Sequence, residues 1–145
     1  MIANQPTRST TAESAPGGRI GHVLLATDLE EASAGAADHA IYLAARHQAV
    51  LQILAVARTS KEAAPMERGV RALRLRACAL GIVATSVVWH GDPAEAILEA
   101  AWTERPDIVV LGSRRSLDLG RVVHGSVSRR VAREAPTRVL VVPVI

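Results

Sequence analysis

The sequence predicts a doubly wound α/β domain, in which a five-stranded parallel sheet carries helices on both faces. Two observations lead to this fold class. Short, continuously apolar runs alternate along the chain with longer segments of helical period. Strands that are apolar on both sides are typical of parallel sheets covered by helices. The five predicted strands are residues 22–27, 50–57, 82–89, 107–113 and 138–145.

The segments between these strands have the length and the end signals of helices. In the third, Asp92 is an N-cap acceptor and Pro93 takes the first helical position, where no N–H is missed. Pro136 stops the fourth. The alternation of strands and helices predicts one domain with right-handed crossovers. The four helices are expected at about residues 33–48, 65–80, 93–105 and 126–135.

Composition limits the class of protein. Of the 145 residues, 49% are hydrophobic and 21% charged, which suits a globular domain at residues 20–145. Residues 1–19, rich in Ser, Thr, Pro and Gly, are expected to form a flexible tail. A single cysteine argues against disulfides, and an N-terminus without an apolar h-region argues against secretion. No apolar run reaches about 18 residues, which argues against a membrane span, so we expect a cytoplasmic protein. A net charge of +3 with three aromatic residues argues against nucleic-acid binding.

The connection after the fourth strand carries most of the chemistry. We expect a loop between Gly112 and Gly125, which is long for an α/β connection. This connection would begin with Gly112 at a strand end and finish with Gly125-Ser126 at a helix start. Backbone N–H groups and the positive end of the helix would then surround one concavity, which suits a phosphate. Taken alone, a Gly-Ser pair at a helix start is more often a helix cap than a ligand site. Seven arginines and two acidic residues lie between residues 112 and 138, a local charge of +5.

Five stretches in this order resemble the universal stress protein family from about His22 to the C-terminus. They are a first strand ending in Thr27-Asp28, an Ala-rich helix with Ser33 near its start, HGDPAEAIL (90–98), DIVVLGS (107–113) and GSVSRRVAREAPTRVLVVPV (125–144). The resemblance implies the sheet order 3-2-1-4-5. Asp28 and Gly112 would then flank the crevice at the switch point between the first and fourth strands, where ligands bind in open α/β sheets.

Many proteins similar to this one bind ATP through G-x2-G-x9-G-[ST]. Here Gly112 fills the first position and Gly125-Ser126 the last, but Arg115 stands where the second glycine belongs. By resemblance, Thr27 and Asp28 would contact the adenosine, Val56 the base, and the others the ribose and phosphates of ATP, ADP or AMP, with Mg²⁺ accompanying the nucleotide. The implied nucleotide-binding residues are Thr27, Asp28, Val56, Leu111, Gly112, Arg115, Gly125, Ser126 and Val127.

Two functions stay open. One is a stress-response protein that binds an adenine nucleotide between strands 1 and 4. The other is a nucleotide-independent dimeric interaction module of the same fold, because Arg115 replaces the middle glycine of the ATP motif. The arginine side chain would either obstruct the phosphate path or clamp a phosphate. The resemblance also implies a homodimer through the C-terminal strand, residues 138–144. We expect neither a catalytic residue nor a metal site, and hence no enzyme, since nothing in the sequence pairs with Asp28 as a second carboxylate or base.

Overall fold

The computed structural model describes residues 19–113, 115–118 and 121–143, and for 115–118 and 121–124 it describes the backbone alone. The predicted tail therefore lies outside the described residues except for Arg19. The end of the last predicted strand, residues 144–145, lies outside them as well.

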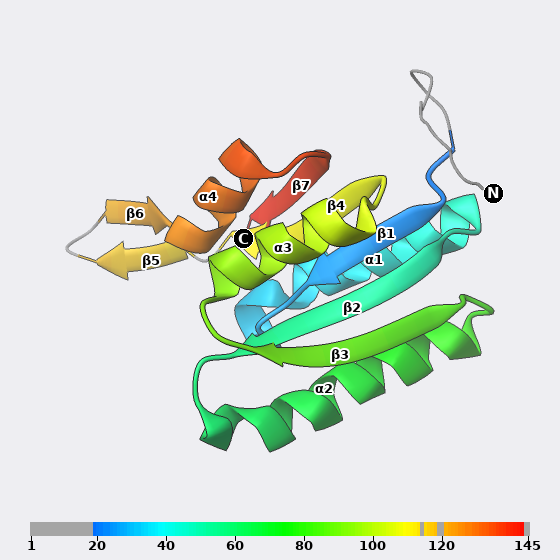
Figure 1. The fold of residues 1–145 in the computed structure, drawn as a ribbon, viewed down its shortest axis with the longest axis horizontal. Helices are drawn as coiled ribbons and strands as arrows, with labels where there is room; N and C mark the ends of the chain where they lie inside the picture. The colour runs from blue at the N-terminus through cyan, green and yellow to red at the C-terminus, as the bar shows by residue number, and fades with distance from the viewer. Residues whose placement is uncertain (1–18, 114, 119–120, 144–145) are drawn as a thin grey trace.

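A parallel five-stranded sheet forms the centre of the described domain (Figure 1). The order is β3-β2-β1-β4-β7, and every neighbouring pair is parallel. This confirms the fold class and the order 3-2-1-4-5. The strands are β1 (His22–Ala26), β2 (Val50–Ala57), β3 (Ala84–His90), β4 (Ile108–Ser113) and β7 (Arg138–Pro143).

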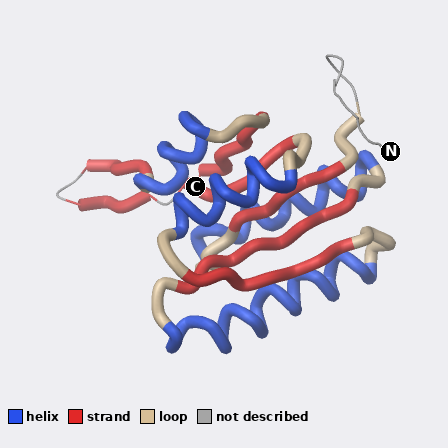
Figure 2. Tube along the Cα trace, in the orientation of Figure 1, coloured by secondary structure: helices blue, strands red, loops and turns tan. Residues whose placement is uncertain are grey.

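Helices cover both faces of the sheet (Figure 2). The helices are α1 (Ala34–His47), preceded by the 3-10 turn η2 (Glu31–Ser33), then α2 (Ser60–Ala79), α3 (Pro93–Glu104) and α4 (Ser126–Glu134). Helices α1 and α2 pack on one face, and α3 and α4 on the other. None of these helices, within the described part of the chain, is long and apolar enough to cross a membrane.

The central strand β1 shows why the apolar runs are continuous. Val23 and Leu25 belong to the core under α1 and α2, whereas Leu24 and Ala26 belong to the core under α3 and α4. Successive side chains of a strand point to opposite faces, so a strand with a helix layer on each side must be apolar at every position.

Helix α2 begins earlier than predicted. The sequence pattern suggests a start near Pro65, but the helix begins at Ser60 and contains Pro65. Its start is held instead by Glu62, whose Oε1 accepts the backbone N–H of Arg58 at 2.7 Å and whose own N–H donates to the carbonyl of Thr59 at 3.2 Å. Pro65 lies only a turn and a half inside the helix, where it removes a single backbone hydrogen bond.

The segment predicted as a loop between Gly112 and Gly125 contains two strands, so that prediction is wrong. Strands β5 (Arg115–Asp118) and β6 (Arg121–His124) pair as an antiparallel hairpin, which extends beyond the main sheet in Figure 1. Val122 and Val123 are a strand signal, because β-branched residues favour extended backbone. The run is too short to stand out beside the main strands.

Candidate functional site

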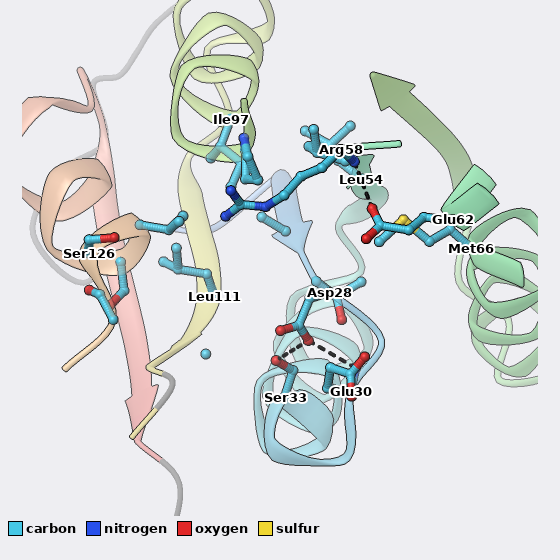
Figure 3. Close-up of a pocket in the computed structure, with 18 residues that line it drawn as sticks. Asp28, Glu30, Ser33, Leu54, Arg58, Glu62, Met66, Ile97, Leu111 and Ser126 are labelled. Carbon is cyan, nitrogen blue, oxygen red and sulfur yellow. Dashed lines mark hydrogen bonds between the residues drawn. The ribbon is translucent and has the colours of Figure 1, made fainter. Parts of the chain in front are cut away.

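A pocket of about 380 Å³ opens at the carboxyl edge of the sheet (Figure 3). The β1–β4 register pairs Ala26 with Leu111, so the residues that follow them, Thr27 and Gly112, emerge side by side. Its walls come from the β1–η2 connection, the first two turns of α2 and the first turns of α3 and α4. The pocket therefore lies at the switch point of the sheet, where open α/β folds bind ligands.

Eight of the nine predicted site residues line this pocket. They are Thr27, Asp28, Val56, Leu111, Gly112, Gly125, Ser126 and Val127. The ninth, Arg115, is the first residue of β5, and its side chain lies outside the described residues. The fold thus gathers into one cavity residues that are up to 100 positions apart in the sequence.

The β1–η2 connection is held by its own side chains. Asp28 Oδ1 accepts the Ser33 hydroxyl at 2.7 Å and the Glu30 N–H at 2.9 Å (Figure 3). Thr27 Oγ1 accepts the N–H of Leu29 at 2.9 Å, and Leu29 has a φ of 65°. Thr27 and Asp28 therefore both stabilise this turn, and the hydrogen bonds fix their positions at the pocket edge.

Gly112 lies at a close approach between β4 and η2. A Cβ at this position would lie 3.2 Å from Ser33 Oγ and 3.4 Å from Ser33 Cα. Because the Ser33 hydroxyl also donates to Asp28, Gly112 keeps the space in which that hydrogen bond is made.

The first turn of α4 forms the opposite wall. Gly125 is the N-cap with a φ of −64°, an ordinary value, and no side chain caps the helix. Ser128 is 3% exposed, and its hydroxyl donates to the Gly125 carbonyl at 3.0 Å. The N–H groups of this first turn have no acceptor within the helix, and the helix dipole adds partial positive charge there. This wall therefore offers hydrogen-bond donors to an anion.

Several lining residues were not predicted from the sequence. Arg58 follows the end of β2, and the rule that ligands bind at the carboxyl ends of parallel strands could have found its position. Glu62 and Met66 lie on the part of α2 whose start was misplaced. No sequence signal distinguishes the remaining lining residues, Ala26, Glu30, Ser33, Leu54, Pro93, Ile97 and Ser128, from ordinary core or turn positions.

The pocket is polarised. Its apolar lining includes Val56, Ile97 and Leu111, which are 7%, 5% and 4% exposed. Carboxylates stand on the side of the β1–η2 connection and α2, at Asp28, Glu30 and Glu62. Within the described residues, no group of three or more His, Cys, Asp or Glu side chains could hold a metal ion. The arrangement suits a ligand with a flat apolar part, hydroxyl groups and an anionic end.

The fold and the pocket define an α/β protein with a ligand cavity at its switch point. The sequence profile of the universal stress protein family matches residues 19–143. The match spans most of the chain, and the chain therefore belongs to the universal stress protein family.

Particular relatives support this assignment. A protein of Thermus aquaticus, the universal stress protein in the QAH/OAS sulfhydrylase 3′ region, is 40% identical over 76 residues, which cover 50% of this chain and 56% of that protein. The chain thus spans little more than half of that relative. Universal stress protein YxiE of Bacillus subtilis is 29% identical over 143 residues, covering 83% of this chain and 97% of that protein. A solved universal stress protein in complex with cAMP has 30% identity and a TM-score of 0.74, covering 88% of this chain and 99% of that one.

Proposed function

We propose that this protein is a cytoplasmic stress-response protein that binds an adenine nucleotide in the pocket between β1 and β4. One observation carries the proposal: Asp28 and the first turn of α4 line opposite walls of the same cavity. A nucleotide combines an apolar base, ribose hydroxyls and a phosphate. The apolar lining would hold the base, the carboxylate would accept the ribose hydroxyls, and the helix N–H groups would donate to the phosphate.

The size of the pocket and one related structure support the proposal. About 380 Å³ falls within the range of roughly 300–1,000 Å³ that small-molecule sites occupy. The related universal stress protein with 30% identity was solved with cAMP. Asp28 would accept a ribose hydroxyl, Val56 would face the base, and Gly125-Ser126 would donate to phosphate.

Isothermal titration with AMP, ADP, ATP and cAMP tests the proposal. The informative variant is Asp28→Asn, which keeps an oxygen for Ser33 and the Glu30 N–H but removes the charge. We expect it to weaken nucleotide binding about tenfold or more, because hydrogen bonds to charged groups contribute about 1.5–3 kcal/mol. Glu67→Gln makes the same change at an exposed position of α2 outside the pocket and should bind as the wild type does. Absence of binding at millimolar nucleotide, or equal binding by Asp28→Asn, would overturn the proposal.

The length of the phosphate chain depends on Arg115. Its side chain either occupies the phosphate path, which would favour AMP over ATP, or clamps a phosphate. Comparing ATP affinity for the wild type and Arg115→Gly separates the two: obstruction predicts tighter ATP binding by the glycine variant. Mg²⁺ would enter with the phosphates of ADP or ATP.

The proposal includes no enzymatic turnover. The Asp28 carboxylate is engaged by a hydroxyl and a backbone N–H, which suits a positioning role better than proton transfer. We expect no sustained hydrolysis of ATP. Multiple turnovers at a constant rate by the purified protein would contradict this.

We also propose a homodimer formed through residues 138–144. Strand β7 is the edge of the sheet, and its Val139, Leu140 and Val141 are only half-buried in the isolated chain. Pairing about a twofold axis would cover this apolar edge. Light scattering at micromolar concentration should give twice the mass of one chain, and a monomer mass would refute the dimer.

The β5–β6 hairpin favours the second candidate function, the nucleotide-independent dimeric module. The hairpin begins at Arg115, the position of the second glycine in the ATP-binding motif. A dimer that binds none of the four nucleotides would support this candidate in place of the first.

A further inference from the structure

The backbone of Arg58 is held in place at the edge of the pocket. It directly follows Ala57, the last residue of β2, and its backbone N–H donates to Glu62 Oε1 at 2.7 Å. The strand and the first turn of α2 therefore both hold the backbone from which the Arg58 side chain starts.

The side chain crosses the pocket. Figure 3 shows it extending from the end of β2 until the guanidinium lies between Ile97 and Leu111. The side chains of Ile97 and Leu111 are apolar and nearly buried, so neither side chain can accept a hydrogen bond from the guanidinium.

No side chain in the described parts of the chain pairs with this guanidinium. Other arginines of the domain do have partners: Arg76 donates to Asp38 at 2.6 Å and Arg74 to Ser86 at 3.1 Å. The nearby carboxylates serve other groups, since Glu62 accepts the Arg58 backbone N–H and Asp28 accepts Ser33. The N–H groups of the planar Arg58 guanidinium can therefore donate hydrogen bonds to a ligand in the pocket.

We propose that Arg58 is a specificity-determining residue that binds the phosphate of the ligand. The phosphate would lie between the guanidinium and the first turn of α4, over Leu111, and would receive donors from both sides. The pocket would then select a phosphorylated nucleoside over the free nucleoside. This inference rests on the proposed function, because it requires an adenine nucleotide in this pocket.

The test compares AMP with adenosine, which differ only in the phosphate. Calorimetric titrations would use the wild type, Arg58→Gln and, as a matched control, Arg68→Gln, an exposed arginine of α2 outside the pocket. Loss of one charged hydrogen bond should weaken AMP binding by Arg58→Gln about 10- to 100-fold and leave adenosine binding within about twofold. The control should match the wild type for both ligands.

A second readout uses ionic strength. AMP binding by the wild type should weaken as salt rises, and this dependence should be smaller in Arg58→Gln because one of the charges that attract the phosphate is gone. Arg58→Lys keeps a charge without the fork and should recover part of the affinity for AMP.

The outcomes separate the two proposals. If the wild type binds both ligands and Arg58→Gln loses them equally, Arg58 contacts the base or ribose, and the phosphate assignment is wrong. Unchanged AMP binding in Arg58→Gln likewise overturns the role of Arg58 and leaves nucleotide binding standing. If the wild type binds neither adenosine nor any of AMP, ADP, ATP and cAMP, nucleotide binding itself is overturned and the role of Arg58 with it.

Discussion

Replacing Gly69 with alanine tests the contact that joins the pocket edge to α2. Gly69 lies in the middle of α2, and a Cβ there would lie 2.7 Å from Leu29 Cδ1 and 3.0 Å from Cδ2. Leu29 must therefore rotate away from the helix. Since Leu29 directly follows Thr27-Asp28, the substitution probes how firmly the pocket edge is held.

Two contributions of similar size oppose each other in Gly69→Ala. Replacing a glycine in a helix interior by alanine stabilises a protein by about 1 kcal/mol. Leu29 is partly buried, and its rotation away from α2 would forfeit part of the roughly 1.5–3 kcal/mol that full burial of a leucine contributes, or about 1 kcal/mol if half of that burial is lost. The wild-type background should therefore show a net change within about 0.5 kcal/mol of zero.

The same substitution in Leu29→Ala should be stabilising. In Leu29→Ala the three atoms nearest to the new Cβ are absent, and the helix gain of about 1 kcal/mol remains. Alanine also keeps a Cβ at the φ of 65°, so the backbone strain is the same in both backgrounds. Urea unfolding of the four proteins gives the coupling free energy, expected at about 1 kcal/mol. Equal stabilisation by Gly69→Ala in both backgrounds would refute the contact.

Three further substitutions test the framework of the domain by urea or thermal unfolding. Asp92→Ala removes the Oδ2 that accepts the Glu95 N–H at 3.0 Å and should cost about 1 kcal/mol, whereas Asp92→Asn keeps a cap and should cost less. Asp107→Ala removes the acceptor of two N–H groups before and at the start of β1, at 2.7 and 2.9 Å, and should cost about 1–3 kcal/mol; equal stability of Asp107→Ala and Asp107→Asn would contradict this. Ile53→Ala opens a cavity at a fully buried position and should cost about 2–5 kcal/mol, while Val83→Ala, at a 68% exposed position, should cost well under 1 kcal/mol.

The strands and the start of α3 could be predicted because local chemistry determines them. Burial on both faces makes the strands continuously apolar, and the predicted strand starts lie within two residues of those observed. The N-cap role of Asp92 is confirmed by its hydrogen bond to the Glu95 N–H. The strand order followed from the family resemblance.

Other features depend on partners far away in the sequence. The constraint on Gly112 comes from Ser33 and that on Gly69 from Leu29, and neither glycine needs a positive φ. The early start of α2 was hidden by Pro65, which reads as a helix start. The end of β2 places Arg58 at the edge of the pocket, but no local pattern encodes the path that its long side chain takes across the pocket.

The strand order has a consequence for the stability of the whole domain. In the described sheet, β1, β2 and β3 form one half and β4 and β7 the other, and the β1–β4 pair alone joins them by strand hydrogen bonds. The pocket lies at the end of this seam, with Asp28 on one side and Gly125 on the other. A ligand there would act as a staple across the seam, adding about 2.7 kcal/mol to the free energy of unfolding at a concentration 100 times its Kd. Binding of the ligand should therefore slow hydrogen exchange of the backbone amides in β1 and β4.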